Sequence, residues 1–340
     1  MSVPRVLVLT AGLGTRLRPL TYVRAKAAVP VNGETLVRRV VRKLGEQGFH
    51  DLVLNLHHLP ATIAASVGDG SDLSARVRYS WEQQVLGSAG GPRRALPLLL
   101  DRYGTPESAT ESSHSGSASR VASGTFVIVN GDTLTDVDIH AMLERHTRSR
   151  ATVTMGLIPN PRPRRYGGVQ VSADGWVTGF LRAGAPGDSY HFIGVQIVEA
   201  RAFAGLPDGV PAETVNTLYP RLIAADPASV AAFICSASFR DIGTPSDYLA
   251  TSAELAAIEG DRMAAGVRVL IAESARTVRT AVWDDVTIGR DAELVECIVG
   301  DGAHIPDEAR YTRCAIVPAC GRTPQEGERL AGELLIKSFV

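Results

Sequence analysis

Apolar runs alternate with amphipathic segments through the first three quarters of the chain. Four runs, VPRVLVL, DLVLNL, FVIVNGD and ATVTMGL, have the composition of buried strands. Between them, the segment ETLVRRVVRKLGEQG places Leu36, Val40 and Leu44 on one face of a helix. This alternation predicts an α/β fold with a doubly wound, mostly parallel sheet over residues 1–255.

A polar stretch interrupts this region at residues 101–124. It is rich in Ser, Gly and Ala and has few large apolar side chains. Such a composition does not bury enough apolar surface to offset the entropy of ordering. We therefore expect a flexible surface insertion that acts as a spacer.

The pattern changes in residues 264–340. Val282, Ile288 and Leu294 are spaced six apart, and Val299 and Ile305 continue that spacing after a step of five. Aliphatic residues at this period are typical of a parallel β-helix, in which each turn covers the apolar side chains of the one before. We expect a short, left-handed β-helix-like tail, with an ordinary β-meander as the alternative.

Composition limits the possible partners. The 340-residue chain has 35 Lys and Arg against 36 Asp and Glu, so no global field attracts nucleic acid or an anionic membrane. No apolar run reaches the roughly 20 residues that a membrane span needs, and no signal-type leader is visible. We expect a cytoplasmic protein whose four cysteines are reduced packing residues, since none lies in a CxxC pair.

The stretch LTAGLGTRLRPLT follows the first apolar run. Gly12 and Gly14 allow a sharp turn in which backbone N–H groups face a phosphate, and Arg16, Arg18 and Lys26 bring positive charge nearby. The stretch lacks the Gly-Lys-Ser/Thr of a Walker loop and the third glycine of a dinucleotide fingerprint. A glycine turn with solvated arginines is the simpler interpretation of these residues taken alone.

The same stretch resembles the signature of the sugar-1-phosphate nucleotidyltransferases. That signature is roughly LAAGxGTRLxPLT followed by KPxxPV, and this chain has LTAGLGTRLRPLT followed by KAAVPV. Five more segments resemble family motifs in the family's order: EQQVLGSAGG, VNGDTL, RYGGV, FIGVQIV and RDIGTPSDYLAT. The resemblance covers about residues 3–255, looks closest to bacterial mannose-1-phosphate guanylyltransferases, and is compatible with the tail, because many members carry a β-helical one.

The resemblance implies an Mg²⁺-dependent attack of a sugar 1-phosphate on the α-phosphorus of a nucleoside triphosphate. An ionised phosphate nucleophile needs alignment and charge neutralisation but no general base. Asp132 and Asp241 are the implied metal ligands, and Arg16 and Lys26 the implied catalytic cations. The implied nucleotide-binding residues are Ala11, Gly12, Gly14, Thr15, Glu82, Gly87, Ser88 and Gly90, and the implied sugar-binding residues are Tyr166, Gly167, Arg182 and Gly194.

The chain departs from the family pattern at several positions. Thr10 replaces a small apolar residue and Ala27 a proline. Where many members have Glu-Lys-Pro, this chain has GFLRAGAPG, with Arg182 at the glutamate position and Ala183 in place of the lysine that binds the sugar phosphate. A non-catalytic subunit that senses nucleotide sugars therefore remains an alternative.

Other questions stay open at this point. Uridylyl or thymidylyl transfer to another sugar 1-phosphate, including N-acetylmuramate 1-phosphate, is an alternative to guanylyl transfer. An acyltransferase built on the hexapeptide coil is a weaker one, because only His304 offers a catalytic group there. His57 and His58 are adjacent and point to opposite faces of a strand, so we expect structural roles. The short coil makes a homo-oligomer possible.

Overall fold

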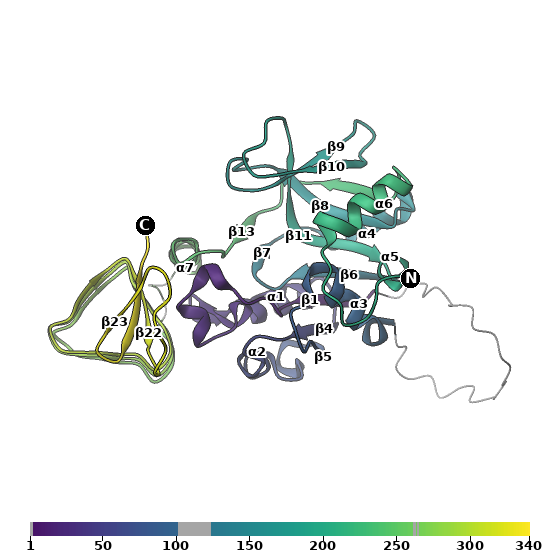
Figure 1. The fold of residues 1–340 in the computed structure, drawn as a ribbon. Coiled ribbons are helices and arrows are strands. Elements are labelled where there is room, and N and C mark those ends of the chain that lie inside the picture. The colour runs from purple at the N-terminus through teal and green to yellow at the C-terminus, as the bar shows by residue number, and fades with distance from the viewer. Residues whose placement is uncertain (1–2, 101–123, 261–262, 264) are drawn as a thin grey trace, which may run out of the picture.

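The computed structural model describes residues 3–100, 124–260, 263 and 265–340. The predicted insertion at 101–124 therefore lies almost entirely outside the described residues. Figure 1 shows an α/β part that carries the N-terminus and a coil of short strands that carries the C-terminus. The division into residues 1–255 and 264–340 stays a prediction.

A sheet with nine described strands forms the centre of the α/β part. Its strands β1, β4, β5 and β6 run parallel, and β11 is antiparallel to β6 and β8. The four predicted apolar runs are confirmed as strands, but the sheet is mixed, because β11, β9 and β10 are joined in antiparallel pairs. The sheet strands are β1 (Val6–Leu9), β4 (Asp51–Leu56), β5 (Arg76–Trp81), β6 (Thr125–Asn130), β8 (Val153–Pro159), β9 (Gly168–Val171), β10 (Val177–Leu181), β11 (Tyr190–Glu199) and β12 (Val230–Ile234).

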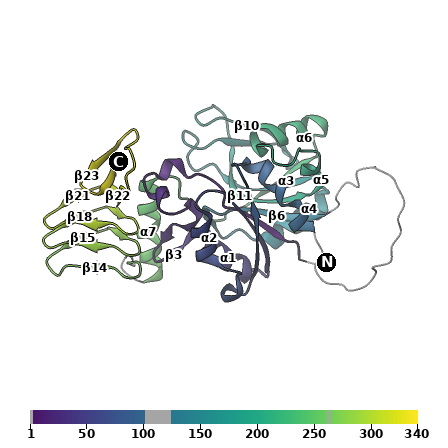
Figure 2. The same ribbon diagram turned by 60° about the horizontal axis from the view of Figure 1, so that its bottom comes forward.

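Helices flank this sheet, except that α7 lies between the α/β part and the coil (Figures 1 and 2). They are α1 (Leu36–Glu46), α2 (Pro60–Val67), α3 (Gly87–Leu100), α4 (Ile139–Ser149), α5 (Arg201–Ala204), α6 (Tyr219–Ala225) and α7 (Pro245–Glu259). Shorter helical turns are η1 (Thr15–Leu17), η2 (Leu20–Tyr22), η3 (Lys26–Ala28), η4 (Ser71–Leu73) and η5 (Thr214–Leu218). Leu36, Val40 and Leu44 of α1 are all buried, as their spacing predicts.

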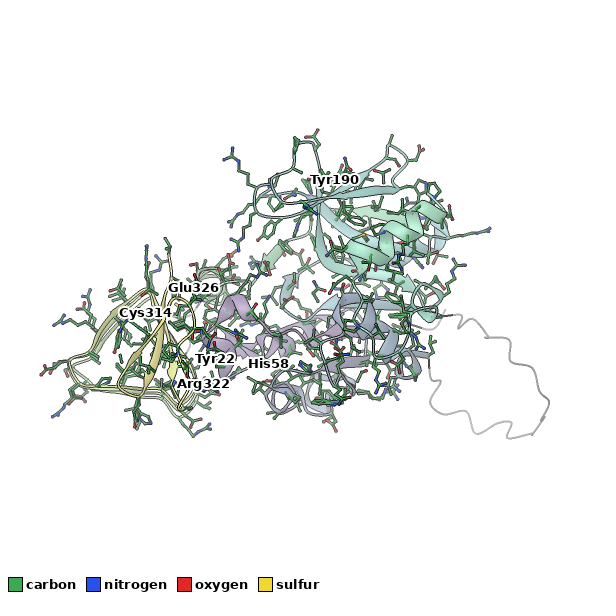
Figure 3. All side chains as sticks on the ribbon, viewed as in Figure 1. Tyr22, His58, Tyr190, Cys314, Arg322 and Glu326 are labelled. Atoms are coloured by element: carbon green, nitrogen blue, oxygen red, sulfur yellow. The ribbon has the colours of Figure 1, made fainter. Side chains whose placement is uncertain are left out.

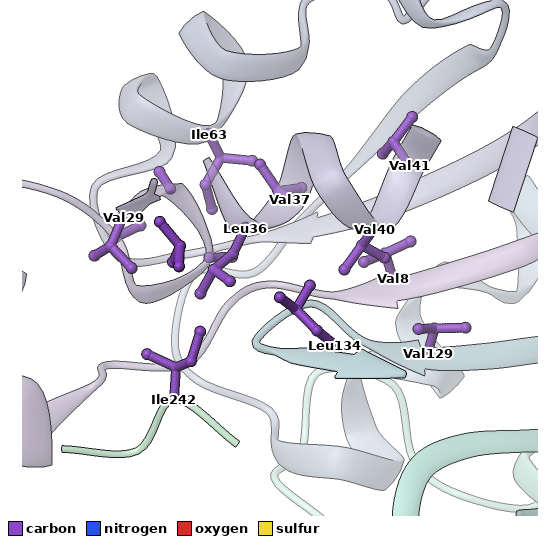
Figure 4. Packing of buried hydrophobic residues seen from close by; sticks show 14 of the residues in the cluster. Val8, Val29, Leu36, Val37, Val40, Val41, Ile63, Val129, Leu134 and Ile242 are labelled. Carbon is purple, nitrogen blue, oxygen red and sulfur yellow. The ribbon is translucent and has the colours of Figure 1, made fainter. Parts of the chain in front are cut away.

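Two short strand pairs complete the α/β part. They are β2 (Pro30–Val31) with β3 (Glu34–Thr35), and β7 (Thr133–Thr135) with β13 (Phe239–Asp241). Leu134 and Ile242 belong to the same buried cluster as Val8, Val29 and Leu36 (Figure 4). This packing fixes the backbone next to Asp132 and Asp241, which lie two residues before Leu134 and one residue before Ile242.

The tail is β-helix-like. Three sets of parallel strands stack in register, and residues that face each other on successive turns are 17 apart. The steps of six, six and five in the sequence therefore make one turn. The strands are β14 (Leu270–Ile271), β15 (Arg276–Val278), β16 (Ala281–Val282), β17 (Thr287–Ile288), β18 (Glu293–Val295), β19 (Ile298–Val299), β20 (His304–Ile305), β21 (Arg310–Thr312) and β22 (Cys314–Pro318).

The five aliphatic residues that define the repeat are buried inside the coil, so the meander alternative is wrong. Figure 2 shows the stacked turns from the side. At the end of the stack, β24 (Leu334–Ser338) pairs antiparallel with β22 and then with β23 (Glu328–Ala331). The prediction that all four cysteines pack inside is wrong for Cys320, which is exposed, although all four are free thiols.

The coil packs against the α/β part through α7 and the segment between β1 and β2. Trp283 is 1% exposed, and its Nε1 donates to the Tyr248 hydroxyl at 2.8 Å. Tyr248 in turn donates to the Pro30 carbonyl at 2.5 Å. Because both side chains are buried, these bonds satisfy polar groups that would otherwise be desolvated without partners.

Candidate active site

The loop after β1 turns back on itself at Gly14. This residue has φ +60°, and a Cβ there would lie 2.7 Å from Thr21 Cγ2 and 3.0 Å from Lys26 Cβ. Glycine is therefore required both by the left-handed backbone and by the close approach of the next segment. The Thr21 hydroxyl donates to the Gly14 carbonyl at 3.0 Å. Ala11 is buried, whereas Gly12, Thr15 and Arg16 are exposed on the outer side of the loop.

Lys26 lies between the two predicted metal ligands. Its Nζ is 2.5 Å from Asp132 Oδ2 and 3.9 Å from Asp241 Oδ1. Asp132 follows β6, and Asp241 ends β13, where it pairs with Thr133 of β7. The fold therefore brings together two carboxylates that are more than 100 residues apart in the sequence, as the resemblance implies.

The electrostatics of this cluster favour a cation. Burial raises the pKa of Asp241; the positive charge of Lys26 opposes that rise, and the negative charge of Asp132 adds to it. Arg16 also lies near Asp241, since a Cβ on Gly243 would lie 3.0 Å from both Arg16 Nη1 and Asp241 Oδ2, and its positive charge likewise opposes the rise in the pKa of Asp241. Two carboxylates that share one ammonium group are hard oxygen donors, and they fit an ion that binds through one or two carboxylates and phosphate oxygens.

Glu82 is buried in a polar network. Its side chain accepts hydrogen bonds from Asn55 Nδ2 at 2.7 Å and from the Leu86 N–H at 2.9 Å. Asn55 Oδ1 accepts from the Thr10 N–H at 2.6 Å, and the Thr10 hydroxyl donates to the Asn55 carbonyl. Thr10 thus has a partner that a small apolar residue would lack. Glu82 supports the start of the phosphate loop from inside, and its predicted contact with a nucleotide stays a prediction.

Gly87, Ser88 and Gly90 open helix α3 and pack against residues 210–214. A Cβ at Gly87 would lie 2.7 Å from the Ala212 carbonyl oxygen, and one at Gly90 would lie 2.6 Å from the Val210 carbonyl oxygen. Ser88 Oγ donates to Glu213 Oε2 at 2.6 Å. These close approaches explain both glycines by packing, and their predicted nucleotide contacts stay predictions.

Tyr166 of the predicted sugar loop belongs to an aromatic cluster. Its ring centroid is 4.5 Å from that of His191 and 5.9 Å from that of Phe239, which lies two residues before Asp241 on β13. Alternate residues of a strand share a face, so the cluster adjoins Asp241. Gly167, the next residue of the loop, is exposed.

His191 was not singled out by the sequence. Both of its ring nitrogens are buried, and neither has a hydrogen-bond partner among the described residues. Burial lowers the pKa of His191, and the nearby backbone of Gly167 partly opposes that shift. No motif pointed to this residue, because only the tertiary fold brings it together with its ring partners: β11 pairs with β9, which follows Tyr166, and Phe239 lies on β13.

Gly194 and Arg182 occupy different environments. Gly194 is buried with φ +79°, and a Cβ there would lie 2.8 Å from Asn130 Nδ2. It therefore leaves room for the side chain that ends β6, two residues before Asp132. Arg182 is exposed just after β10, so the structure does not bring it into the cluster of Lys26, Asp132 and Asp241.

His57 and His58 contact the carbonyls of Glu82 and Thr21, respectively, which confirms separate structural roles.

Comparison with known proteins agrees with this arrangement. A family model described as "Nucleotidyl transferase" matches residues 5–258. The chain belongs to this nucleotidyl transferase family. The chain is therefore a nucleotidyltransferase, and the matched region contains Arg16, Lys26, Asp132 and Asp241. No helix of the described residues is long and apolar enough to cross a membrane.

Similar proteins of this family act on several sugar phosphates. A mannose-1-phosphate guanylyltransferase from Mycobacterium tuberculosis is 27% identical over 91% of this chain and 82% of its own length. An N-acetylmuramate α-1-phosphate uridylyltransferase from Neisseria meningitidis is 30% identical over 64% of this chain and 83% of its own. The crystal structure of HddC from Yersinia pseudotuberculosis shares the fold, with a TM-score of 0.60, 21% identity, and coverage of 74% of this chain and all of that one.

Proposed function

We propose that this nucleotidyltransferase condenses a nucleoside triphosphate with a sugar 1-phosphate, and that its substrates are GTP and mannose 1-phosphate. The observation that carries the reaction class is Lys26 between Asp132 and Asp241, with Arg16 against Gly243. The mannose-1-phosphate guanylyltransferase of M. tuberculosis supports the choice of substrates, because its similarity extends over 91% of the chain and hence into the coil.

The reaction exchanges one phosphate linkage for another. A phosphate oxygen of the sugar 1-phosphate forms a bond to the α-phosphorus, and the bond from that phosphorus to the bridging oxygen of the β-phosphate breaks. Pyrophosphate leaves with the electron pair, and no proton has to be removed from the nucleophile. Arg16 and Lys26 neutralise the charge that develops on the leaving group, and the backbone of Gly12, Gly14 and Thr15 holds the phosphates.

Asp132 and Asp241 would hold Mg²⁺. The ion supplies charge neutralisation for the phosphate oxygens when it is bound. In this arrangement Lys26 moves its ammonium group away from the carboxylates and toward the phosphates. Free thiols and the use of nucleoside triphosphates support a cytoplasmic location, which is part of the proposal.

The sugar side is the part of the proposal that departs most from the family. Tyr166 stacks near Phe239, two residues before Asp241, and the family motif adds Gly167 and Gly194, while Ala183 replaces the lysine that the motif uses for the sugar phosphate. We propose that exposed Arg182 takes over that charge when the loop after β10 closes on the substrate. The N-acetylmuramate enzyme of N. meningitidis makes uridylyl transfer the second candidate function.

The decisive experiment measures pyrophosphate release. GTP, UTP, dTTP, ATP and CTP are each combined with Mg²⁺ and a panel of sugar 1-phosphates, with Asp132→Asn as the control. Release that requires GTP, mannose 1-phosphate and Asp132 supports the proposal, whereas release only with UTP and another sugar phosphate supports the second candidate. Thermal stabilisation by a nucleotide sugar without turnover of any pair would identify a sensing subunit.

A further inference from the structure

The coil holds the segment that carries Lys26 through one buried arginine. Arg24 donates to Asp284 Oδ2 at 2.5 Å and to both oxygens of Asp301, at 2.9 and 2.5 Å. The two aspartates occupy equivalent positions on successive turns, 17 residues apart. The Arg24 guanidinium also lies over the Trp283 ring, 5.7 Å from its centroid. One side chain of the α/β part is thus fixed by three residues of the coil.

These contacts are shielded from water. The Arg24 side chain is 14% exposed, and those of Asp284 and Asp301 are 28% and 24% exposed. Burial lowers the pKa of Arg24, but the hydrogen bonds and charges of Asp301 and Asp284 outweigh it and raise that pKa overall. Burial also raises the pKa of Asp301. Since a buried carboxylate depends strongly on its partner, the pairing holds Arg24 in one place.

A second contact fixes the same segment nearer to the phosphate loop. The Tyr22 ring has the Arg18 guanidinium 5.3 Å from its centroid and the Arg322 guanidinium 5.4 Å from it. Arg322 also donates to the Tyr22 carbonyl at 3.3 Å. Figure 3 shows Tyr22 and Arg322 at the junction between the coil and the α/β part. The coil therefore holds the chain at both Tyr22 and Arg24.

Lys26 lies two residues after Arg24. The short helical turn η3 begins at Lys26, and the intervening Ala25 N–H donates to Thr62 Oγ1 at 3.1 Å. The backbone between Arg24 and Lys26 is therefore held on both sides and has little freedom to move. Misplacement of a catalytic charge by about 1 Å lowers a rate by up to roughly 100-fold. The position of the Lys26 ammonium group relative to Asp132 thus depends on contacts made outside the α/β part.

We propose that Arg24 is a positioning residue: its ion pairs with Asp284 and Asp301 of the coil set the position of Lys26 in the active site. The coil then serves the reaction directly, in addition to any role in assembly. This inference rests on the proposed function for its kinetic test, and it has a separate structural readout.

The kinetic test is a double-mutant cycle in the full chain. Arg24→Met lowers kcat/KM for the triphosphate by between about 10- and 100-fold, and it causes no further loss in a Lys26→Met background. The matched control is Arg268→Met, which removes an ion pair with Asp285 that lies on the exposed side of the coil. Losses that multiply in the double variant would overturn the proposal.

Arg24→Met leaves Asp284 and Asp301 without their partner and can therefore destabilise the fold. A second variant separates this effect from the loss of the positioning contact. Arg24→Met combined with Asp284→Asn and Asp301→Asn removes the uncompensated charges together with the anchor. It is expected to fold and to keep the loss in kcat/KM, whereas wild-type kcat/KM in this variant would contradict the proposal. Arg24→Lys keeps the charge without the forked geometry and should recover part of the rate.

Hydrogen–deuterium exchange supplies the readout that does not need turnover. Peptides covering residues 20–28 exchange faster in the Arg24 variants than in the wild type and the Arg268→Met control. If no pair of substrates turns over, the proposed function fails, and binding of GTP to the single and double variants replaces kcat/KM in the cycle. Unchanged exchange in residues 20–28 would overturn the positioning role in either case.

Discussion

The ammonium group of Lys26 bonds to the carboxylate of Asp132 at 2.5 Å, and the same carboxylate is one of the two ligands proposed for Mg²⁺. Under that proposal, lysine and metal would compete for one acceptor. With Asp241 close by, removal of Lys26 leaves two carboxylates with less compensation, and a divalent cation becomes the best available partner.

Lys26→Met is expected to destabilise the metal-free protein by roughly 1.5–3 kcal/mol, the range for hydrogen bonds to charged groups. Mg²⁺ should restore more stability to this variant than to the wild type, because it no longer displaces an ammonium group. Thermal unfolding with increasing Mg²⁺ measures both effects. Lys337→Met, on β24 of the coil, is the control, and equal Mg²⁺ shifts in all three proteins would contradict the competition.

Gly194 and Gly184 have nearly the same φ angle but different surroundings. Comparing alanine substitutions at the two positions therefore separates the cost of backbone strain from the cost of steric crowding. Gly194 has φ +79° against Asn130, whereas Gly184 has φ +81° and no heavy atom within 4 Å of the place that a Cβ would occupy. Alanine at either position costs about 1–2 kcal/mol for the left-handed backbone. Gly194→Ala should cost roughly 1–3 kcal/mol more for overpacking and should lower turnover by shifting Asn130. Urea unfolding of both variants checks this, and equal losses would refute the crowding argument.

His191 predicts a dependence of stability on pH. Its pKa is lowered in the folded state, so the unfolded chain binds the proton more readily, and stability falls as the pH drops below the unfolded value of about 6.5. His191→Phe keeps the stacking and removes this contribution to the slope between about pH 7.5 and 5.5. Unfolding by urea at both pH values measures it. His140→Phe, which changes another stacked histidine, keeps His191 and should keep the slope.

Glu82→Gln tests the buried network beneath the phosphate loop. Both Glu82 oxygens accept hydrogen bonds, so the amide NH₂ of glutamine must face a donor, at a cost of about 1–3 kcal/mol. We expect lower stability and a higher KM for the triphosphate, because Asn55 and Thr10 lose their support. Gln83→Ala, at the exposed neighbouring position, should change neither quantity. A KM for the triphosphate equal to that of the wild type in Glu82→Gln would show that the Glu82 network does not support the phosphate loop.

Periodicity predicted most of the fold, because it reports burial directly. The four apolar runs are strands, and the spacing of Val282, Ile288 and Leu294 marks the faces of the coil. The antiparallel half of the sheet did not follow from the same signal. A buried strand such as β11 is apolar in either direction, and only its partners decide which way it runs.

The site was predicted unevenly for a similar reason. Asp132, Asp241 and Lys26 lie in segments with a recognisable order of residues, and the fold brings them together. Glu82 has the expected position but a buried environment, which no spacing reveals. His191 acquires its ring partners from the loop before β9 and from β13, and Arg24 acquires its partners from the coil, so no local pattern marks them.

The 17-residue turn of the coil has a consequence for how such a chain changes length. A whole turn can be added or removed beyond Asp301 while every later side chain keeps its orientation, and Asp284 and Asp301 would still meet Arg24. An insertion of another size within a strand face would shift the following residues and expose their aliphatic side chains, whereas an insertion at a corner can loop out into solvent. Within the strand faces, a segment that is duplicated or lost is therefore expected to preserve the stack when it comprises 17 residues.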